Sequence, residues 1–171
     1  LGELIGLMTD SLMTCHVSAR NMRLKCLTHV VSCFSPDDKK QQEQIPAIIG
    51  EVMLCLKDSN GKTRESAYQL LLVMAESRND IEDFYKIILG GYAGTTPHMR
   101  SAAVQALCRV VFEYAGVGDV TQRLLPSLLK TTLILFRENA REVIKSVVGF
   151  VRICVAAMDE DALEPLLPEL V

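Results

Sequence analysis

Residues 45–72 read IPAIIGEVMLCLKDSNGKTRESAYQLLL, and residues 125–152 read LPSLLKTTLILFRENAREVIKSVVGFVR. The two stretches align without a gap at a shift of 80 residues, with apolar residues on apolar residues and Lys57-Asp58 on Arg137-Glu138. Few residues are identical, but the match of the pattern is continuous. Internal similarity at a fixed period is typical of repeat architectures, so we expect the chain to be an array of repeats.

A shift of 80 residues implies two units of about 40 residues each, which is the size of a HEAT or armadillo repeat. The intermediate unit is visible, because RESAYQLL at 64–71 resembles RSAAVQAL at 100–107. If Arg23, Arg64, Arg100 and Ile144 are equivalent, the spacings are 41, 36 and 44 residues. Such variable spacing suits pairs of helices joined by loops of different length.

Apolar residues recur at steps of three and four along the chain, which predicts amphipathic helices. Glycine, proline and small polar residues separate the segments and act as stops and caps. The predicted first helices of the pairs are Gly2–Met13, Gln41–Leu56, Ile81–Tyr92 and Thr121–Phe136. The predicted second helices are Ala19–Phe34, Lys62–Met74, His98–Tyr114 and Asn139–Ala157.

The sequence therefore predicts an all-α fold, a right-handed α-solenoid of antiparallel helical pairs that is HEAT/ARM-like and contains about four and a half repeats. The predicted repeats are residues 1–35, 36–78, 79–117, 118–158 and a partial fifth repeat at 159–171. The chain begins at Leu1 and finishes within an apolar pattern. We therefore expect a fragment, with the rest of the same solenoid chain at both ends.

The composition excludes several classes of protein. Of the 171 residues, 49% are hydrophobic, which is too many for a disordered segment, and the net charge of −3 excludes a wholly basic nucleic-acid module. Aromatic residues make up 5% and tryptophan is absent, which argues against stacking on bases or sugars. The longest apolar stretch, 143–158, is too short and too charged to span a membrane.

The six cysteines show no CxxC pair, and most of them lie among aliphatic residues. We expect reduced thiols that pack as small hydrophobic residues in a cytosolic or nuclear protein. Cys26, His29 and Cys33 share one helix face and could bind zinc. The favoured alternative is that Cys26, Val30 and Cys33 are buried with His29 at the edge, and we predict no metal site.

No catalytic constellation is present in the sequence. It has no GxSxG, no P-loop and no HExxH motif, and the glycine-rich segment 90–94 resembles a helix stop with a turn. Nothing local pairs any of the three histidines with a carboxylate that could orient it as a base. We predict that the protein is not an enzyme and takes no cofactor and no small-molecule substrate.

A basic stretch runs through residues 121–152, although the total charge is slightly negative. Arg141, Lys145 and Arg152 lie on one side of a predicted helix, and Arg137 lies one turn earlier. These four are the candidate nucleic-acid-binding residues, through contacts with RNA phosphates. The alternative is a solvated face with Glu138–Arg141 and Glu142–Lys145 pairs of little energetic weight.

Two segments about 80 residues apart carry a resemblance to a known family. They are KTRESA at 62–67 and REVIKSVVGFV at 141–151, supported by MRSAAVQAL at 99–107 and FEY at 112–114. Together they are similar to the ribosomal RNA processing protein twelve family, and the resemblance covers most of residues 41–157. It implies a nuclear and nucleolar HEAT and armadillo-like solenoid without enzymatic activity.

The resemblance implies a scaffold in ribosome biogenesis that binds pre-ribosomal RNA, ribosome-assembly proteins or both during rRNA processing and pre-ribosome maturation and export. It implies a location in the nucleus and nucleolus and allows shuttling to the cytoplasm. No membrane partner is expected. The alternative function is a nuclear transport or signalling adaptor of the importin or kinase-scaffold kind, which binds protein partners through a concave groove.

Overall fold

The computed structural model describes residues 1–117, 119–166 and 168. Every regular element among these residues is a helix, so that part of the chain has no β-strand. The helices fall into two compact units, Leu1–Ile87 and the chain from Ile88 onward. Among the described helices, none combines the length and the apolar character that a membrane crossing requires.

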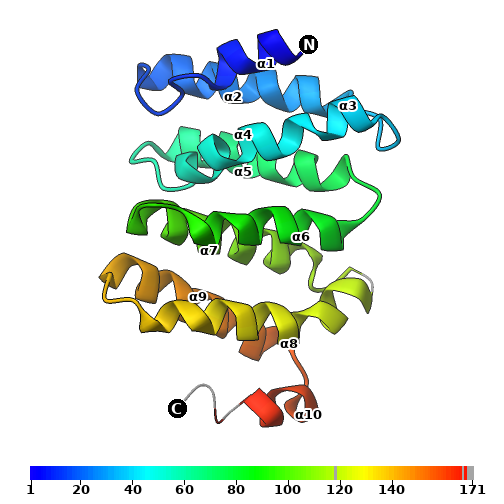
Figure 1. Cartoon of the computed structure of the whole chain (residues 1–171), viewed down its shortest axis with the longest axis vertical. Helices are drawn as coiled ribbons and strands as arrows, with labels where there is room; N and C mark the ends of the chain where they lie inside the picture. The colour runs from blue at the N-terminus through cyan, green and yellow to red at the C-terminus, as the bar shows by residue number, and fades with distance from the viewer. Residues whose placement is uncertain (118, 167, 169–171) are drawn as a thin grey trace. The chain divides into compact units, whose positions relative to one another are not determined.

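The first unit contains two layers of helices. They are α1 (Gly2–Thr9) and α4 (Gln44–Cys55) in one layer, and α2 (Val17–Ser32) and α5 (Gly61–Glu76) in the other. Helix α1 packs against α4, and α2 packs against α5 along much of its length (Figure 1). The short helix α3 (Lys39–Gln42) leads into α4, and Asp38 caps its start. Each long pair therefore buries apolar faces both within the pair and against the neighbouring pair.

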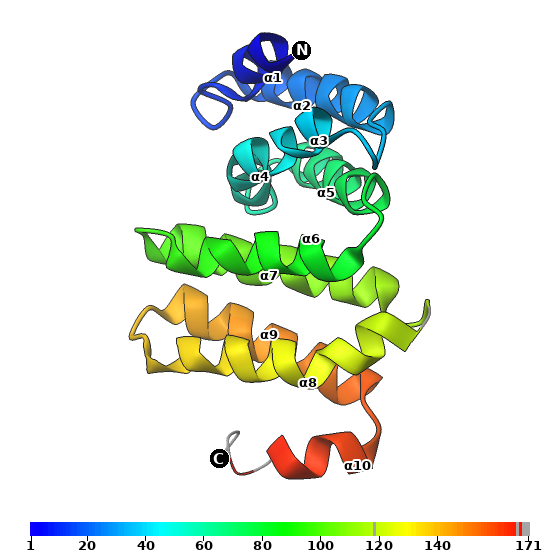
Figure 2. The same ribbon diagram turned by 45° about the vertical axis from the view of Figure 1, so that its right-hand side comes forward.

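The second unit repeats this arrangement. Its second helices α7 (Pro97–Tyr114) and α9 (Arg141–Ala157) lie against each other, and α8 (Asp119–Leu133) packs on α9 (Figure 2). Short 3₁₀ helices precede α7 (η1, Gly91–Ala93) and α9 (η2, Ile134–Arg137). The remaining elements are α6 (Ile81–Gly90), where the two units join, and the terminal α10 (Glu160–Leu163) and η3 (Glu164–Leu166).

The eight long helices expected from the sequence are present, with ends that differ by a few residues. Local capping explains where the second helices begin. Asn60 accepts hydrogen bonds from two backbone amides of α5, Thr96 accepts one from Met99, and His16 accepts one from Ser18. One face of α7 is apolar and packed, because Ala103, Leu107, Val110 and Val111 are buried, and Tyr114 lies half-buried at the edge of this face.

The fourth residue of three second helices is an arginine that binds the loop before its own helix. These residues are Arg20, Arg64 and Arg100, while α9 has Ile144 at this position. The structure therefore corrects the equivalence expected for Arg23, which lies one turn too late. The corrected spacings are 44, 36 and 44 residues.

Arg20 illustrates the contacts of this position. Its guanidinium donates hydrogen bonds to the carbonyls of Leu12 (2.9 Å), Met13 (2.5 Å) and Cys15 (3.0 Å), and it forms an ion pair with Asp58 in the loop of the next pair. Burial alone would lower the pKa of Arg20, but the hydrogen bond and charge of Asp58 outweigh it, so the pKa is raised. The ion pair is almost completely enclosed and links α2 to the α4–α5 loop.

Gly94 is the residue that makes the turn before α7 possible. A Cβ atom at this position would lie 2.8 Å from Met99 Cβ and 3.0 Å from the carbonyl oxygen of Gly91. Both distances are too short, so only glycine fits without a shift of the backbone. The expectation that segment 90–94 forms a helix stop and a turn is thus confirmed.

The six cysteines differ in burial, and the expectation that they pack as small hydrophobic residues is wrong for the two that are exposed. Cys55 and Cys154 are buried and Cys15 and Cys108 are half-buried, but Cys26 on α2 and Cys33 at the C-terminal cap of α2 are exposed. The equivalent of Cys26 is fully buried in later second helices, as Leu70 in α5 and Phe150 in α9. Because these equivalents are buried, the apolar pattern predicted that Cys26 is buried too. Cys26 is exposed because no second helix precedes α2 among the described residues to cover it.

We predict that Arg20→Ala, or Asp58→Ala, lowers the free energy of unfolding by about 3–5 kcal/mol, because each leaves a buried charge without its partner. Urea denaturation followed by circular dichroism measures this change. Lys86→Ala is the matched control, since Lys86 forms exposed pairs with Glu82 and Asp83 on α6. We expect the control to change the free energy of unfolding much less, because exposed ion pairs contribute little to stability. If all three variants lost the same small free energy of unfolding, the Arg20–Asp58 pair would not be a buried ion pair that stabilises the fold.

We also predict selective reactivity of the thiols. Burial raises the pKa of Cys55 and of Cys154 to about 12, so both remain protonated at pH 8 and are shielded from reagents. Cys26 and Cys33 should react with maleimide in the folded protein, and Cys55 and Cys154 only after unfolding. Mass spectrometry of labelled peptides gives the order, and early labelling of Cys154 would contradict the packing described here.

Candidate nucleic-acid interface

The four candidate cations lie at the start and along one side of α9. Arg137 is the last residue of η2, Arg141 is the first residue of α9, and Lys145 and Arg152 follow on the same helix. All four side chains are exposed. The structure thus brings the four residues to one helix and its leading turn, as the spacing predicted.

The acidic residues beside these cations have other partners. Glu138 binds Arg100 of α7 through two hydrogen bonds, of 2.5 Å from Nε and 2.9 Å from Nη2. Glu142 Oε2 lies 3.2 Å from His98 Nδ1, also on α7. Among the described residues, no ion pair joins Glu138 to Arg141 or Glu142 to Lys145, as the alternative interpretation would require. Glu138 instead links the loop between η2 and α9 to α7, and Glu142 links α9 itself to α7.

The four cations consequently keep their charge unpaired. None of them forms a hydrogen bond or an ion pair through its side chain with a described residue. An unpaired exposed cation is hydrated and can exchange that water for a phosphate oxygen. The surface of η2 and α9 thus presents more positive charge to solvent than the sum of the charged residues in this stretch of sequence indicates.

The opposite face of α9 explains why the cations point outward. Val143, Val147, Phe150 and Cys154 are fully buried, and Ser146 hydrogen-bonds Ser101 of α7 at 2.8 Å. This buried face fixes the rotation of the helix. Ser101 and Ser146 thus join α7 to α9, and the sequence, examined one helix at a time, did not pair them.

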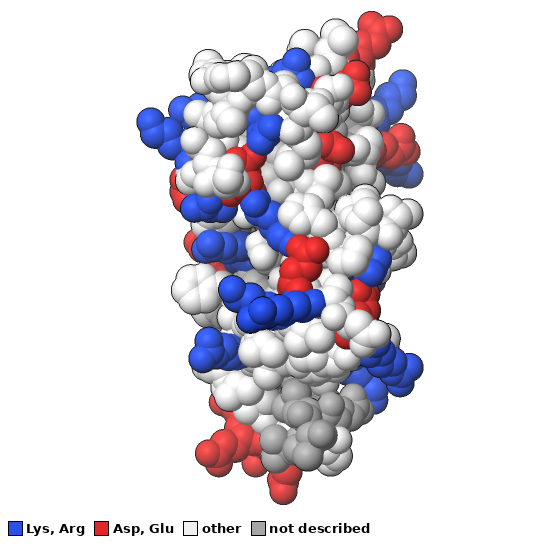
Figure 3. Space-filling view, turned by 90° about the vertical axis from the view of Figure 1, so that its left-hand side faces the viewer, with Lys and Arg blue, Asp and Glu red and all other residues white. Residues whose placement is uncertain are grey.

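Beside the cations the surface is slightly hollowed. Arg141, Glu142, Ile144, Lys145 and Val148 line an open depression of about 660 Å³. In the space-filling view, basic and acidic side chains lie next to one another rather than in a single unbroken basic patch (Figure 3). The candidate surface is therefore a local group of cations, suited to a few phosphates.

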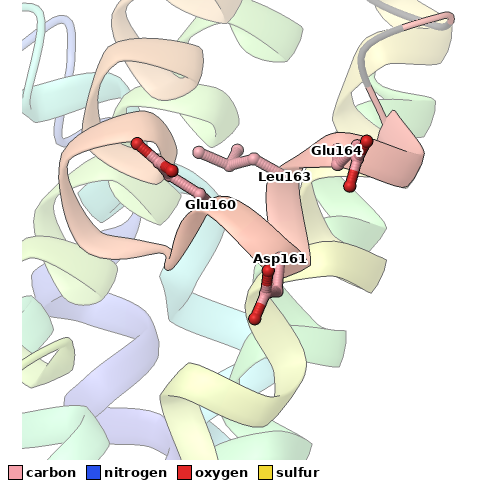
Figure 4. Close-up of a pocket in the computed structure, with 4 residues that line it drawn as sticks. All are labelled: Glu160, Asp161, Leu163 and Glu164. Atoms are coloured by element: carbon pink, nitrogen blue, oxygen red, sulfur yellow. The ribbon is translucent and has the colours of Figure 1, made fainter.

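A second hollow, of about 480 Å³, lies at α10 and is lined by Glu160, Asp161, Leu163 and Glu164. Its side chains leave the ribbon in different directions, so the carboxylates do not converge on one point (Figure 4). No group of three or more His, Cys, Asp or Glu side chains in the described part of the chain could hold a metal ion. That holds for Cys26, His29 and Cys33 as well.

The arrangement of helices defines the class of protein. A solved structure described as "Structural Basis of Tubulin Recruitment and Assembly by Microtubule Polymerases with Tumor Overexpressed Gene (TOG) Domain Arrays" matches 96% of this chain and 33% of that chain, with a TM-score of 0.68 and 18% identity. The fold is therefore all-α and built from HEAT/ARM-like helical pairs, which confirms the predicted fold class.

Residues 5–171 match the family described as XMAP215/Dis1/CLASP, TOG domain, and the chain belongs to this family. The names of the curated relatives refer to ribosomal RNA processing and not to the TOG domain. "Ribosomal RNA-processing protein 12" of Saccharomyces cerevisiae is 27% identical over 99% of this chain, and the human "RRP12-like protein" is 30% identical over 93%. These relatives confirm the resemblance to the ribosomal RNA processing protein twelve family. The chain spans only 15% and 12% of their lengths.

Proposed function

We propose that this chain is a non-catalytic scaffold in ribosome biogenesis that binds pre-ribosomal RNA, assembly factors or both during rRNA processing and pre-ribosome maturation and export. The names of the curated relatives support the process. The unpaired cations Arg137, Arg141, Lys145 and Arg152 support RNA as the ligand. The observation that carries the proposal is that all four cations are exposed and form no side-chain hydrogen bond or ion pair with a described residue.

The contact that we propose is electrostatic. Arg137 and Arg141 lie at the η2–α9 turn and Lys145 and Arg152 along α9, so they would touch successive phosphates of one RNA strand. With only 5% aromatic residues in the chain, stacking on bases contributes little. Binding by charge alone gives low sequence specificity and strong dependence on salt. Such binding suits a scaffold that holds an RNA without reacting with it.

The same proposal places the protein in the nucleus and nucleolus, where precursors of ribosomal RNA are processed. It assigns no catalytic residue. The buried faces of the helices are filled by apolar side chains, and the hollows at α9 and α10 are open and shallow. A scaffold requires surfaces of this kind rather than an enclosed pocket.

We predict that replacing Arg137, Arg141, Lys145 and Arg152 together by alanine weakens RNA binding at least tenfold at low salt. The variant neutralises fewer phosphates, so its binding releases fewer counterions from the RNA. Fluorescence anisotropy with a single-stranded pre-ribosomal RNA fragment at several salt concentrations measures both affinity and salt slope. The slope of log K against log salt should flatten by up to about 3.

The matched control replaces four exposed lysines of the first unit, Lys25, Lys39, Lys40 and Lys62, and so removes the same total charge. We expect it to lower affinity much less than the α9 variant. If the two variants bind RNA with the same affinity and the same salt slope, the α9 cations are not the phosphate contacts.

A further inference from the structure

Thr96 is an exposed hydroxyl residue with a proline directly after it. It is the N-cap of α7, its backbone is extended with φ −114° and ψ 150°, and its Oγ1 accepts a hydrogen bond of 3.2 Å from the amide of Met99. The other three second helices begin after His16, Asn60 and Ala140, which carry no hydroxyl group. Proline-directed protein kinases phosphorylate a serine or threonine that proline follows. The start of α7 therefore differs from the other three in presenting this dipeptide.

The guanidinium of Arg100 lies beside this cap. Its Nη1 donates a hydrogen bond of 2.7 Å to the carbonyl oxygen of Gly94, so the side chain runs back along the loop that holds Thr96. Its Nε and Nη2 donate to Glu138, in the loop before α9, at 2.5 Å and 2.9 Å. Both loops lie at the same end of the second unit (Figure 2). A negative group attached to Thr96 would thus stand next to the pair of Arg100 with Glu138.

We propose that Thr96 is the substrate of a proline-directed protein kinase and that its phosphorylation weakens RNA binding at α9. The kinase transfers the γ-phosphoryl group of ATP to Thr96 Oγ1. A bond forms between this oxygen and the γ-phosphorus, the bond from the γ-phosphorus to the bridging oxygen of ADP breaks, and the hydroxyl proton is released. The phosphothreonine carries a charge of about −1.5 to −2 at pH 7. The effect on RNA rests on the proposed function, whereas the modification does not.

Arg100 is the residue that passes the change on to α9. A phosphoryl group at the N-cap is stabilised by the positive end of α7, one turn before Arg100. Because it has more charge and more acceptor oxygens than a carboxylate, it replaces Glu138 as the partner of Arg100. The released Glu138 directly follows Arg137 and lies three residues before Arg141. Its carboxylate then neutralises part of the positive charge that the α9 cations present to an RNA.

The chain offers a matched comparison for this modification. Its two Ser/Thr-Pro dipeptides are Ser35-Pro36 and Thr96-Pro97. Ser35 is exposed in the first unit, where its Oγ accepts a hydrogen bond of 3.4 Å from the amide of Asp37. Phosphorylation of Ser35 adds the same charge to the chain without touching the pair of Arg100 with Glu138. The Ser35→Ala variant therefore isolates Thr96, and the Thr96→Ala variant isolates Ser35.

The modification itself is tested by treating the whole chain with ATP and a purified proline-directed kinase, followed by mass spectrometry. We expect phosphate on Thr96 in the Ser35→Ala variant and none there after the further change Pro97→Ala, because the kinase recognises the proline. Alanine is accepted at the first position of a helix, and circular dichroism checks that the variant folds. Absence of phosphate from Thr96, or labelling that does not depend on Pro97, would overturn the proposal.

The exchange of partners is measured without RNA. Urea denaturation of alanine variants gives the coupling energy between Arg100 and Glu138 in the Ser35→Ala background. We expect this coupling to be favourable before treatment with the kinase and near zero once Thr96 is phosphorylated. A coupling that phosphorylation leaves unchanged would show that Arg100 keeps Glu138, and the proposed exchange would be wrong.

The effect on RNA is read by fluorescence anisotropy at low salt. Phosphorylated Ser35→Ala protein should bind the single-stranded RNA fragment at least about fivefold more weakly than the untreated protein, whereas treatment should not change binding by Thr96→Ala. Equal affinities before and after phosphorylation of Thr96 would overturn the regulation. If the untreated chain binds no RNA, the proposed function fails and the regulation with it, while labelling of Thr96 and loss of the coupling still identify the modification site.

Discussion

The arginine at the fourth position of a second helix is the interaction on which the arrangement of each unit depends. It fills the space between the loop before its own helix and the loop of the next pair. Arg20 binds three carbonyls and Asp58, and Arg100 binds the carbonyl of Gly94 at 2.7 Å and the carboxylate of Glu138. A lysine could not make these contacts at once, because it lacks the planar fork of donors. The loops are thereby fixed, and the second helices start in register.

The surface chemistry of α9 is a consequence of this constraint. Since Arg100 takes Glu138 and His98 takes Glu142, the carboxylates nearest the basic residues lie against α7. Arg137, Arg141, Lys145 and Arg152 remain exposed and without side-chain partners in the described structure. A chain with a net charge of −3 can therefore present a local group of cations. The packing between helices, more than the composition, determines what this surface can bind.

The helices and their pairing could be predicted from the sequence because apolar periodicity, caps and glycine stops are local signals. The partners of the charged residues could not. Glu138 is three residues from Arg141 and 38 residues from Arg100, and sequence alone favours the nearer cation. The prediction that Cys26 is buried was wrong for the same reason, because the burial of this side chain depends on a neighbouring helix. Arg20 could have been found as the arginine placed four residues after a capping residue, as Arg64 and Arg100 are.

Whether Glu138 pairs with Arg100 or with Arg141 decides whether the cations of α9 remain unpaired. Double-mutant cycles with alanine, followed by urea denaturation, measure the coupling energy of each pair. We predict a clearly favourable coupling energy for Arg100 with Glu138 and a value near zero for Arg141 with Glu138. The reverse result, with coupling only between Arg141 and Glu138, would mean that the cations of α9 are neutralised locally and that the proposed RNA surface does not exist.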